Sequence, residues 1–195
     1  MGKVLLIVGP HGVGKTTLFA YARKRNEMIV RDGFRFSTLG YDLGLDSEFV
    51  RYQDSYIERI CEEIRQIRAS AKDGLVIRSL EESSYYFWLR GSPGLLDAYC
   101  DKMCTLKNLM VDRIVYLDAP YDVLQLRYRN DAARDMPETE AWYREKYAGY
   151  RAFWLSYPGV TVLQTGALKV GDVYAAVKSI AAGSEKDVNG IAPDK

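Results

Sequence analysis

The stretch Gly9-Pro-His-Gly-Val-Gly-Lys-Thr16 decides the fold of this 195-residue chain. It satisfies the pattern G-x-x-x-x-G-K-[ST], in which glycines let the backbone turn so that successive N–H groups point at phosphate oxygens. The apolar run Val4–Val8 before it is typical of a buried strand in a parallel sheet, and Lys15 to Arg25 after it reads as a helix. This order of strand, glycine-rich loop and helix predicts a phosphate-binding loop.

Each part of this loop has an expected partner on ATP. Lys15 is expected to place its ammonium on the β- and γ-phosphates, and Thr16 to offer its hydroxyl to Mg²⁺. The helix that follows adds the positive end of its dipole. His11, the one histidine, is expected to point outward. The predicted ATP-binding residues are Gly9, His11, Gly12, Val13, Gly14, Lys15, Thr16 and Thr17; Lys15 is also a predicted catalytic residue, and Thr16 the predicted metal ligand.

Outside the loop, short apolar runs alternate with segments of helical periodicity. This alternation predicts an α/β fold, a parallel sheet with helices on both faces, in one domain over residues 1–182. The polar residues 183–195 are predicted to be a disordered tail. No helix or strand is assigned between 78 and 93. Strands are expected at 4–8, 28–30, 75–77, 114–117 and 160–163, and helices at 15–25, 47–72, 94–110, 118–129, 140–156 and 170–182.

Composition narrows the class of protein. The net charge is +1, whereas a protein that functions mainly by binding duplex DNA is usually much more basic. The cysteines Cys61, Cys100 and Cys104 are odd in number and lack a CxxC pair, so we interpret them as reduced thiols in a cytoplasmic protein. The early apolar run Val4–Val8 is far too short for a membrane span.

Two absences separate this chain from other proteins with a phosphate-binding loop. A GTPase should carry an Asn-Lys-x-Asp element for guanine, and the sequence has none. The strand 75–77 ends at Arg78-Ser79 and not at the acidic residue of an evident Walker B element.

Several short motifs resemble the thymidylate kinase and deoxynucleoside kinase family over most of residues 3–182. They are Arg31-Asp32 after the second strand, Tyr52-Gln53 with Tyr56 on the long helix, Arg78-Ser79 after the third strand, and the arginines after residue 126. The resemblance implies a three-layer P-loop kinase fold with a five-stranded parallel sheet. It also implies transfer of the γ-phosphate of ATP, with Mg²⁺, to a nucleoside or nucleoside monophosphate, and a homodimer formed through helices that flank the substrate site.

The resemblance assigns roles on the acceptor side. Asp32 is the candidate base that takes the proton of the acceptor hydroxyl; the alternative is a turn aspartate before Gly33. Gln53 is the candidate that holds the edge of the nucleobase, and the alternative is an exposed helix glutamine. Arg78 is the candidate clamp on the acceptor or the transferring phosphate. The family's acidic residue before this arginine is Ile77 here, so Glu81 or Glu82 would have to replace it.

A lid over about residues 127–139 is the other implied feature. Its arginines, Arg127, Arg129 and Arg134, would stabilise the negative charge on the transferring phosphate. The alternative is that they lie on a solvated helix face. The aromatics near Asp32 are candidates to stack on a base, whereas those of the helix 140–156 have core spacing. The stacking candidates are Phe34, Phe36 and Tyr41.

Two other functions stay open at this point. The first is a P-loop kinase that acts on a modified base or an end of a nucleic-acid polymer, such as DNA. The run of aromatics from Tyr85 to Trp88 would suit it as a stacking platform, although four together more often form a partly buried segment. The second is a nucleotide switch without turnover.

Overall fold

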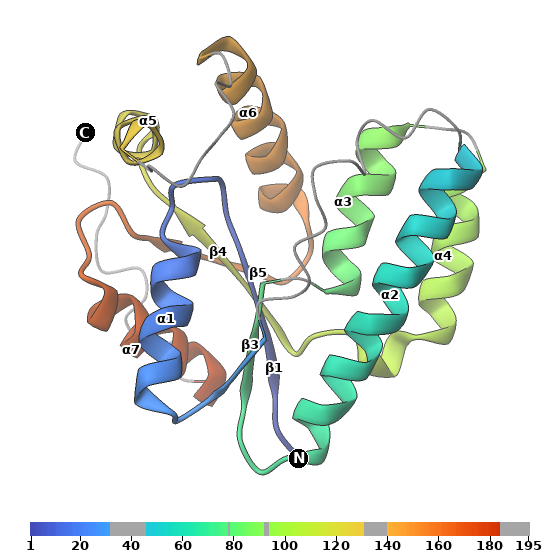
Figure 1. Cartoon of the computed structure of the whole chain (residues 1–195), viewed down its shortest axis with the longest axis horizontal. Coiled ribbons are helices and arrows are strands. Elements are labelled where there is room, and N and C mark those ends of the chain that lie inside the picture. The colour runs from blue at the N-terminus through green and yellow to red at the C-terminus, as the bar shows by residue number, and fades with distance from the viewer. Residues whose placement is uncertain (32–45, 78, 92–93, 131–139, 184–195) are drawn as a thin grey trace. The chain divides into compact units, whose positions relative to one another are not determined.

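The computed structural model describes residues 1–31, 46–77, 79–91, 94–130 and 140–183. Five strands form one sheet in the order β2-β3-β1-β4-β5 (Figure 1). The strands are β1 (Val4–Val8), β2 (Ile29–Arg31), β3 (Gly74–Val76), β4 (Arg113–Asp118) and β5 (Val160–Gln164). The helices are α1 (Lys15–Arg25), α2 (Asp46–Ala69), α3 (Leu80–Arg90), α4 (Leu95–Thr105), α5 (Tyr121–Arg129), α6 (Glu140–Ser156) and α7 (Val170–Ala182), with a 3₁₀ turn, η2, at Lys107–Leu109.

The chain divides into two compact units, and each is described by itself. The first unit comprises residues 1–7 and 27–112. In it, β3 pairs in parallel with both β1 and β2, so that Gly74 lies opposite Val4 on one side and Ile29 on the other. Helices α2, α3 and α4 lie side by side (Figure 1). The buried residues of α2 recur every three or four positions, as expected of a helix that covers a core.

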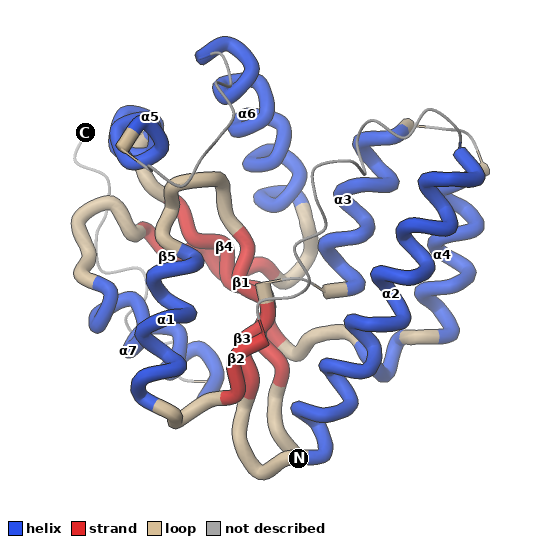
Figure 2. Tube along the Cα trace, viewed as in Figure 1, coloured by secondary structure: helices blue, strands red, loops and turns tan. Residues whose placement is uncertain are grey.

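The second unit comprises residues 8–26 and 113–195. Here β4 and β5 pair in parallel from Ile114 opposite Val160 to Asp118 opposite Gln164 (Figure 2). Helices α1 and α7 pack together, and the rings of Tyr21 and Tyr174 meet edge to face 5.5 Å apart. β4 is buried over all but its first residue, as expected for a central strand of an α/β sheet.

Helix α3 is the main difference from the sequence prediction. The hydroxyl of Ser79 accepts a hydrogen bond from the amide of Glu82 and so caps the helix, and Gly91, with φ 65°, ends it. The aromatic residues on α3 serve mainly in packing: Phe87 stacks on Tyr99 with ring centroids 4.4 Å apart. Tyr85 and Phe87 are buried, whereas Trp88 keeps 49% of its surface exposed.

Three helix boundaries differ from the prediction by a few residues. The helix expected at 47–72 ends at Ala69, and the helix expected at 94–110 ends at Thr105 and is followed by the 3₁₀ turn. The helix expected at 118–129 begins at Tyr121. Helix ends fray into such turns, so boundaries are the least certain part of a sequence pattern. In the described ranges, no helix combines the length and the apolar character that crossing a membrane requires.

Candidate active site

The phosphate-binding loop joins β1 to α1, and its glycines have the backbone angles that the motif requires. Gly9 has φ 149° and Gly14, at the N-cap of α1, has φ 103°. Residues with a side chain rarely adopt such angles. Gly9 is also tightly packed, because a Cβ atom there would lie 2.5 Å from the carbonyl oxygen of Leu117. The loop therefore rests directly on the end of β4.

Lys15 projects back over its own loop. Its ammonium donates hydrogen bonds to the carbonyl oxygens of Gly9 and, at 3.0 Å, of Pro10. The side chains of Thr16 and Thr17 are exposed on the first turn of α1, as is that of His11 within the loop. A cation and two hydroxyls thus lie beside a helix N-terminus, which is an arrangement that binds anions.

Thr165, just after β5, connects this loop to the end of β4. Its hydroxyl lies 3.4 Å from the carbonyl oxygen of Val13 and 3.0 Å from that of Asp118, and its amide donates to the same Asp118 oxygen at 2.7 Å. Thr165 is almost completely buried. The floor of the loop is therefore built from the ends of two neighbouring strands.

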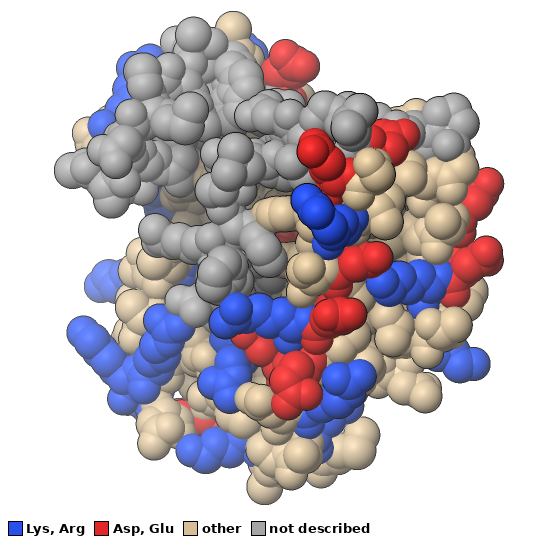
Figure 3. Space-filling view, turned by 45° about the vertical axis from the view of Figure 1, so that its right-hand side comes forward, with Lys and Arg blue, Asp and Glu red and all other residues tan. Residues whose placement is uncertain are grey.

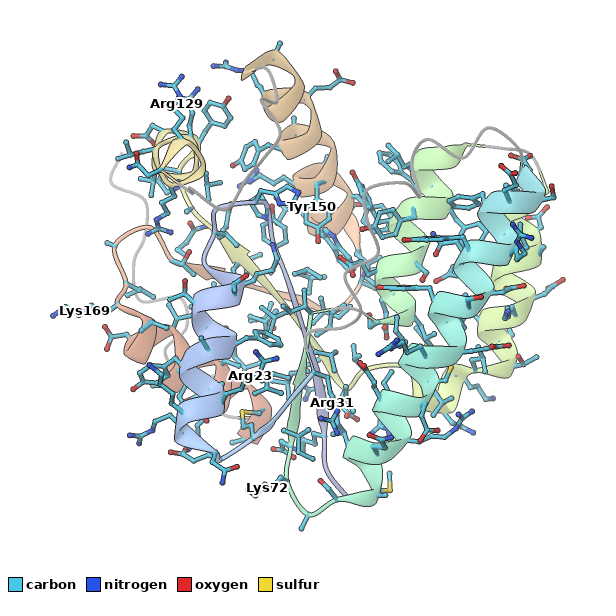
Figure 4. All side chains as sticks on the ribbon, in the orientation of Figure 1. Arg23, Arg31, Lys72, Arg129, Tyr150 and Lys169 are labelled. Carbon is cyan, nitrogen blue, oxygen red and sulfur yellow. The ribbon has the colours of Figure 1, made fainter. Side chains whose placement is uncertain are left out.

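Two arginines of the predicted lid lie on α5. Arg127 donates through Nη2 to the carbonyl oxygen of Gly166 at 3.2 Å, and so holds the turn after β5. Arg129 is exposed in the last turn of α5 (Figure 4). The structure thus gives Arg127 a local partner within the second unit.

An ionic cluster around the buried Asp118 occupies the end of β4 on the side that faces α6. Asp118 accepts hydrogen bonds from Nε and Nη2 of Arg151 at 3.3 and 3.1 Å and from Nε2 of Gln164 at 3.2 Å. Beside it, the rings of Tyr116 and Tyr150 lie 6.4 Å apart (Figure 4). Burial, and after it the negative charge of Asp118, raises the pKa of Tyr147. Sequence patterns did not indicate this cluster.

The fit of Mg²⁺ to this loop follows from the donor set. No group of three or more His, Cys, Asp or Glu side chains converges anywhere in the described ranges, so no all-protein cage is present there. Mg²⁺ usually binds through substrate phosphates, waters and one or two protein oxygens. The exposed hydroxyl of Thr16 at the start of α1 suits that mode.

A family model described as "AAA domain" matches residues 5–147, which is more than half of the chain and includes the whole loop. The chain belongs to the AAA domain family. A search of curated proteins gives no match.

Solved structures similar to this AAA domain include deoxyadenosine kinase from M. mycoides with the products dCMP and a flexible dCDP bound. The TM-score is 0.65 at 14% identity, over 92% of this chain and 99% of that one. The same enzyme with bound dATP gives a TM-score of 0.62 at 16% identity, with the same coverage. This likeness confirms the predicted P-loop kinase fold with its five-stranded parallel sheet.

The residues predicted for the acceptor side fall within the sequence range of the first unit, and the best described is Gln53 on α2. It is 2% exposed, which rules out the exposed helix glutamine considered above. Its Oε1 has no hydrogen-bond partner among the described residues. One turn further, the hydroxyl of Tyr56 donates to Oε2 of Glu82 at 3.2 Å. Gln53 and Tyr56 thus share the buried face of α2.

Glu81 and Glu82 differ in surroundings, although both were considered as replacements for the acidic residue missing at Ile77. Glu81 accepts a hydrogen bond from the amide of Val111 at 2.8 Å, and burial raises the pKa of its carboxyl group. It therefore anchors the segment before β4. Glu82 instead pairs with Tyr56, on the same buried face of α2 as Gln53.

Other predicted site residues lie outside the described ranges, and their roles stay predictions. They are Asp32, Phe34, Phe36, Tyr41, Arg78 and Arg134. Arg31, which precedes Asp32, donates through Nη2 to Oε1 of Gln66 on the outer face of α2 (Figure 4). Its guanidinium is thus directed at the surface of the helix.

Proposed function

We propose that this AAA domain protein is an ATP-dependent phosphotransferase that moves the γ-phosphate of ATP to a nucleoside or nucleoside monophosphate. The observation that carries the proposal is the Lys15 ammonium, held over a glycine loop at the N-terminus of α1. The fold around it is shared along nearly the whole chain with a deoxyadenosine kinase.

On the donor side, the loop amides and Lys15 would bind the β- and γ-phosphates. The ammonium would exchange the carbonyl oxygens of Gly9 and Pro10 for phosphate oxygens, which make stronger, charge-assisted hydrogen bonds. Mg²⁺ would neutralise phosphate charge, with Thr16 as its protein ligand. Of the arginines predicted for the lid, Arg127 and Arg129 lie on α5, and Arg134 would lie further along in the predicted lid.

On the acceptor side, Gln53 is our candidate for holding the nucleobase. A buried amide can donate and accept at once, so it matches a base edge. Asp32 would take the proton of the attacking hydroxyl as the phosphoryl group arrives. Arg78 would clamp the acceptor, and Phe34, Phe36 and Tyr41 would stack on its base.

A small acceptor is better supported than a nucleic-acid polymer. The aromatic run on α3 lies mostly in packing contacts and provides no row of exposed rings. Acidic and basic side chains are interspersed on the coloured part of the face in Figure 3, in which the helices of the first unit come forward. We further propose that the protein acts in the cytoplasm, where its thiols stay reduced; a homodimer remains a prediction.

The test is transfer of radiolabelled phosphate from ATP to panels of nucleosides, nucleoside monophosphates and modified-base DNA oligonucleotides. Label on a nucleoside or monophosphate, lost in Lys15→Ala, is the expected result. Label on oligonucleotides alone would favour the polymer-directed kinase. ATP binding without transfer to any acceptor would favour a nucleotide switch and overturn the proposal.

A further inference from the structure

Asp118 and Arg151 form an ion pair that the residue assignments above do not use. Asp118 is the last residue of β4 and is 3% exposed, and its Oδ2 accepts from both Nε and Nη2 of Arg151. Gln164, opposite Asp118 in β5, donates to the same oxygen. The two hydrogen bonds from Arg151 thus end on one carboxylate oxygen, and together they restrict the orientation of the guanidinium group.

The same residue supports the phosphate-binding loop through its backbone. The carbonyl oxygen of Asp118 accepts from the amide and the hydroxyl of Thr165, and that hydroxyl lies 3.4 Å from the carbonyl oxygen of Val13 in the loop. Gly9 packs on Leu117, one residue earlier. The side chain of Asp118 therefore holds Arg151 at the strand end on which the loop rests.

The ion pair between Arg151 and Asp118 is not fully buried. Its side chain is 40% exposed, whereas that of its partner is 5% exposed. The two bonds to Asp118 use Nε and Nη2, and within the described part of the chain no hydrogen bond is seen from Nη1. The hydrogen bonds to Asp118 also raise the pKa of Arg151. An oriented, partly exposed guanidinium whose Nη1 is not bonded to Asp118 is suited to binding phosphate oxygens.

We infer that Arg151 is a further phosphate-binding residue of the nucleotide site, and that Asp118 is the positioning residue that orients it. Ligands of parallel α/β sheets bind beyond the carboxyl ends of the strands, where this pair lies. Arg151 also comes from α6, the helix that follows the predicted lid segment. The inference rests on the proposed function for its ligand, but its test needs ATP alone.

The test is calorimetric titration of the whole chain with ATP and Mg²⁺, and with ADP and Mg²⁺. Losing a charge-assisted hydrogen bond should weaken ATP binding by roughly tenfold or more in Arg151→Met and by less in Arg151→Lys. Asp118→Asn should weaken it by less than Arg151→Met. Combining both changes should add nothing to Arg151→Met, because Asp118 acts through Arg151. Arg113→Met, at the exposed opposite end of β4, is the matched control and should leave ATP affinity unchanged.

Urea unfolding of the same variants separates binding from structure. If Arg151→Met lowers stability but its affinity for ATP is within twofold of that of the wild type, the pair only holds α6 in place and the inference is wrong. If Arg151→Met does not fold, Arg151→Lys decides on the same criterion. Additive losses in the double variant would remove Asp118 from the positioning role. A chain that binds ATP through Arg151 but transfers no phosphate would overturn the proposed function and leave this inference standing.

Discussion

The hydroxyl oxygen of Thr165 lies 3.4 Å from the carbonyl oxygen of Val13 in the phosphate-binding loop. The hydroxyl has one hydrogen, which it can donate either to Val13 or to Asp118 at 3.0 Å. A single buried side chain therefore connects β5, the end of β4 and the loop. Its removal should affect both the stability of this unit and the binding of phosphate.

Thr165→Val keeps the shape of the side chain and removes the hydroxyl. We expect a loss of about 1 kcal/mol in the free energy of unfolding, since a buried hydrogen bond disappears. ATP affinity should fall severalfold, because the loop loses a support. Urea unfolding and calorimetry measure the two effects. Thr161→Val, on β5 shortly before Thr165, is the control; an equal loss of ATP affinity there would contradict the specific role of Thr165.

Lys15→Ala should lower phosphate transfer by at least about a hundredfold, because the transferring phosphate loses its nearest positive charge. The fold should persist, since the hydrogen bonds of the Lys15 ammonium to Gly9 and Pro10 lie within its own loop. A labelled-ATP assay and circular dichroism check the two statements. Wild-type turnover in this variant would refute our interpretation of the loop.

Gly9→Ala and Gly149→Ala should have opposite effects on stability. At Gly9 the new Cβ would lie 2.5 Å from the carbonyl oxygen of Leu117 at a φ of 149°, so we expect a loss of more than about 1 kcal/mol. At Gly149, inside α6, no atom of the described residues beyond the neighbouring helix backbone lies within 4 Å of an added Cβ, so alanine should stabilise the protein by roughly 0.5–1 kcal/mol. Thermal unfolding of both variants tests the pair, and two effects of the same sign would be the contrary result.

Glu81→Gln should change how stability depends on pH. Burial raises the pKa of Glu81 above its ordinary value of 4.5, so the folded state holds this proton over a range in which the unfolded chain has lost it. The wild type therefore loses stability relative to the variant as pH rises from about 4.5 through the raised pKa. Urea midpoints from pH 4 to pH 8 measure the difference. Parallel curves for the two proteins would contradict this account.

Gln53→Ala should weaken binding of the acceptor and leave binding of ATP unchanged. The amide of Gln53 is buried, and we propose that the nucleobase supplies its hydrogen-bond partner, so truncation should raise the acceptor KM by roughly tenfold. The ATP KM should not change. Gln66→Ala is a matched control on the same helix, since Gln66 is exposed and bonds Arg31 and Glu62. An acceptor KM that stays at the wild-type value would end the nucleobase role.

The sequence predicted the elements whose signals are local. The loop from Gly9 to Thr16 carries its own pattern, and each strand is a short apolar run bounded by polar residues or glycine, so all five strands were predicted to within one or two residues. Helix α3 was missed although Ser79 and Glu82 form a capping pair, because the aromatic run that follows conceals helical spacing.

The cluster at the end of β4 could not be predicted in this way. Asp118 and Arg151 are 33 residues apart, and their pairing depends on how α6 packs on the strands. The burial of Gln53 likewise depends on tertiary packing, since α3 meets the same face of α2 at Phe49 and Tyr56. Sequence periodicity places such residues on a face of an element but does not say what that face meets.

The pairing of β4 with β5 also affects how the chain acquires its structure. Asp118 and Gln164 lie side by side although 46 residues separate them, and α5 and α6 intervene. Contacts so distant in sequence form only after a long loop has closed, which slows the search for the native state. We expect this unit to refold slowly compared with a helical bundle of the same size. Until β5 arrives, the edge of β4 would be exposed to pairing with other chains, so dilute conditions should favour recovery.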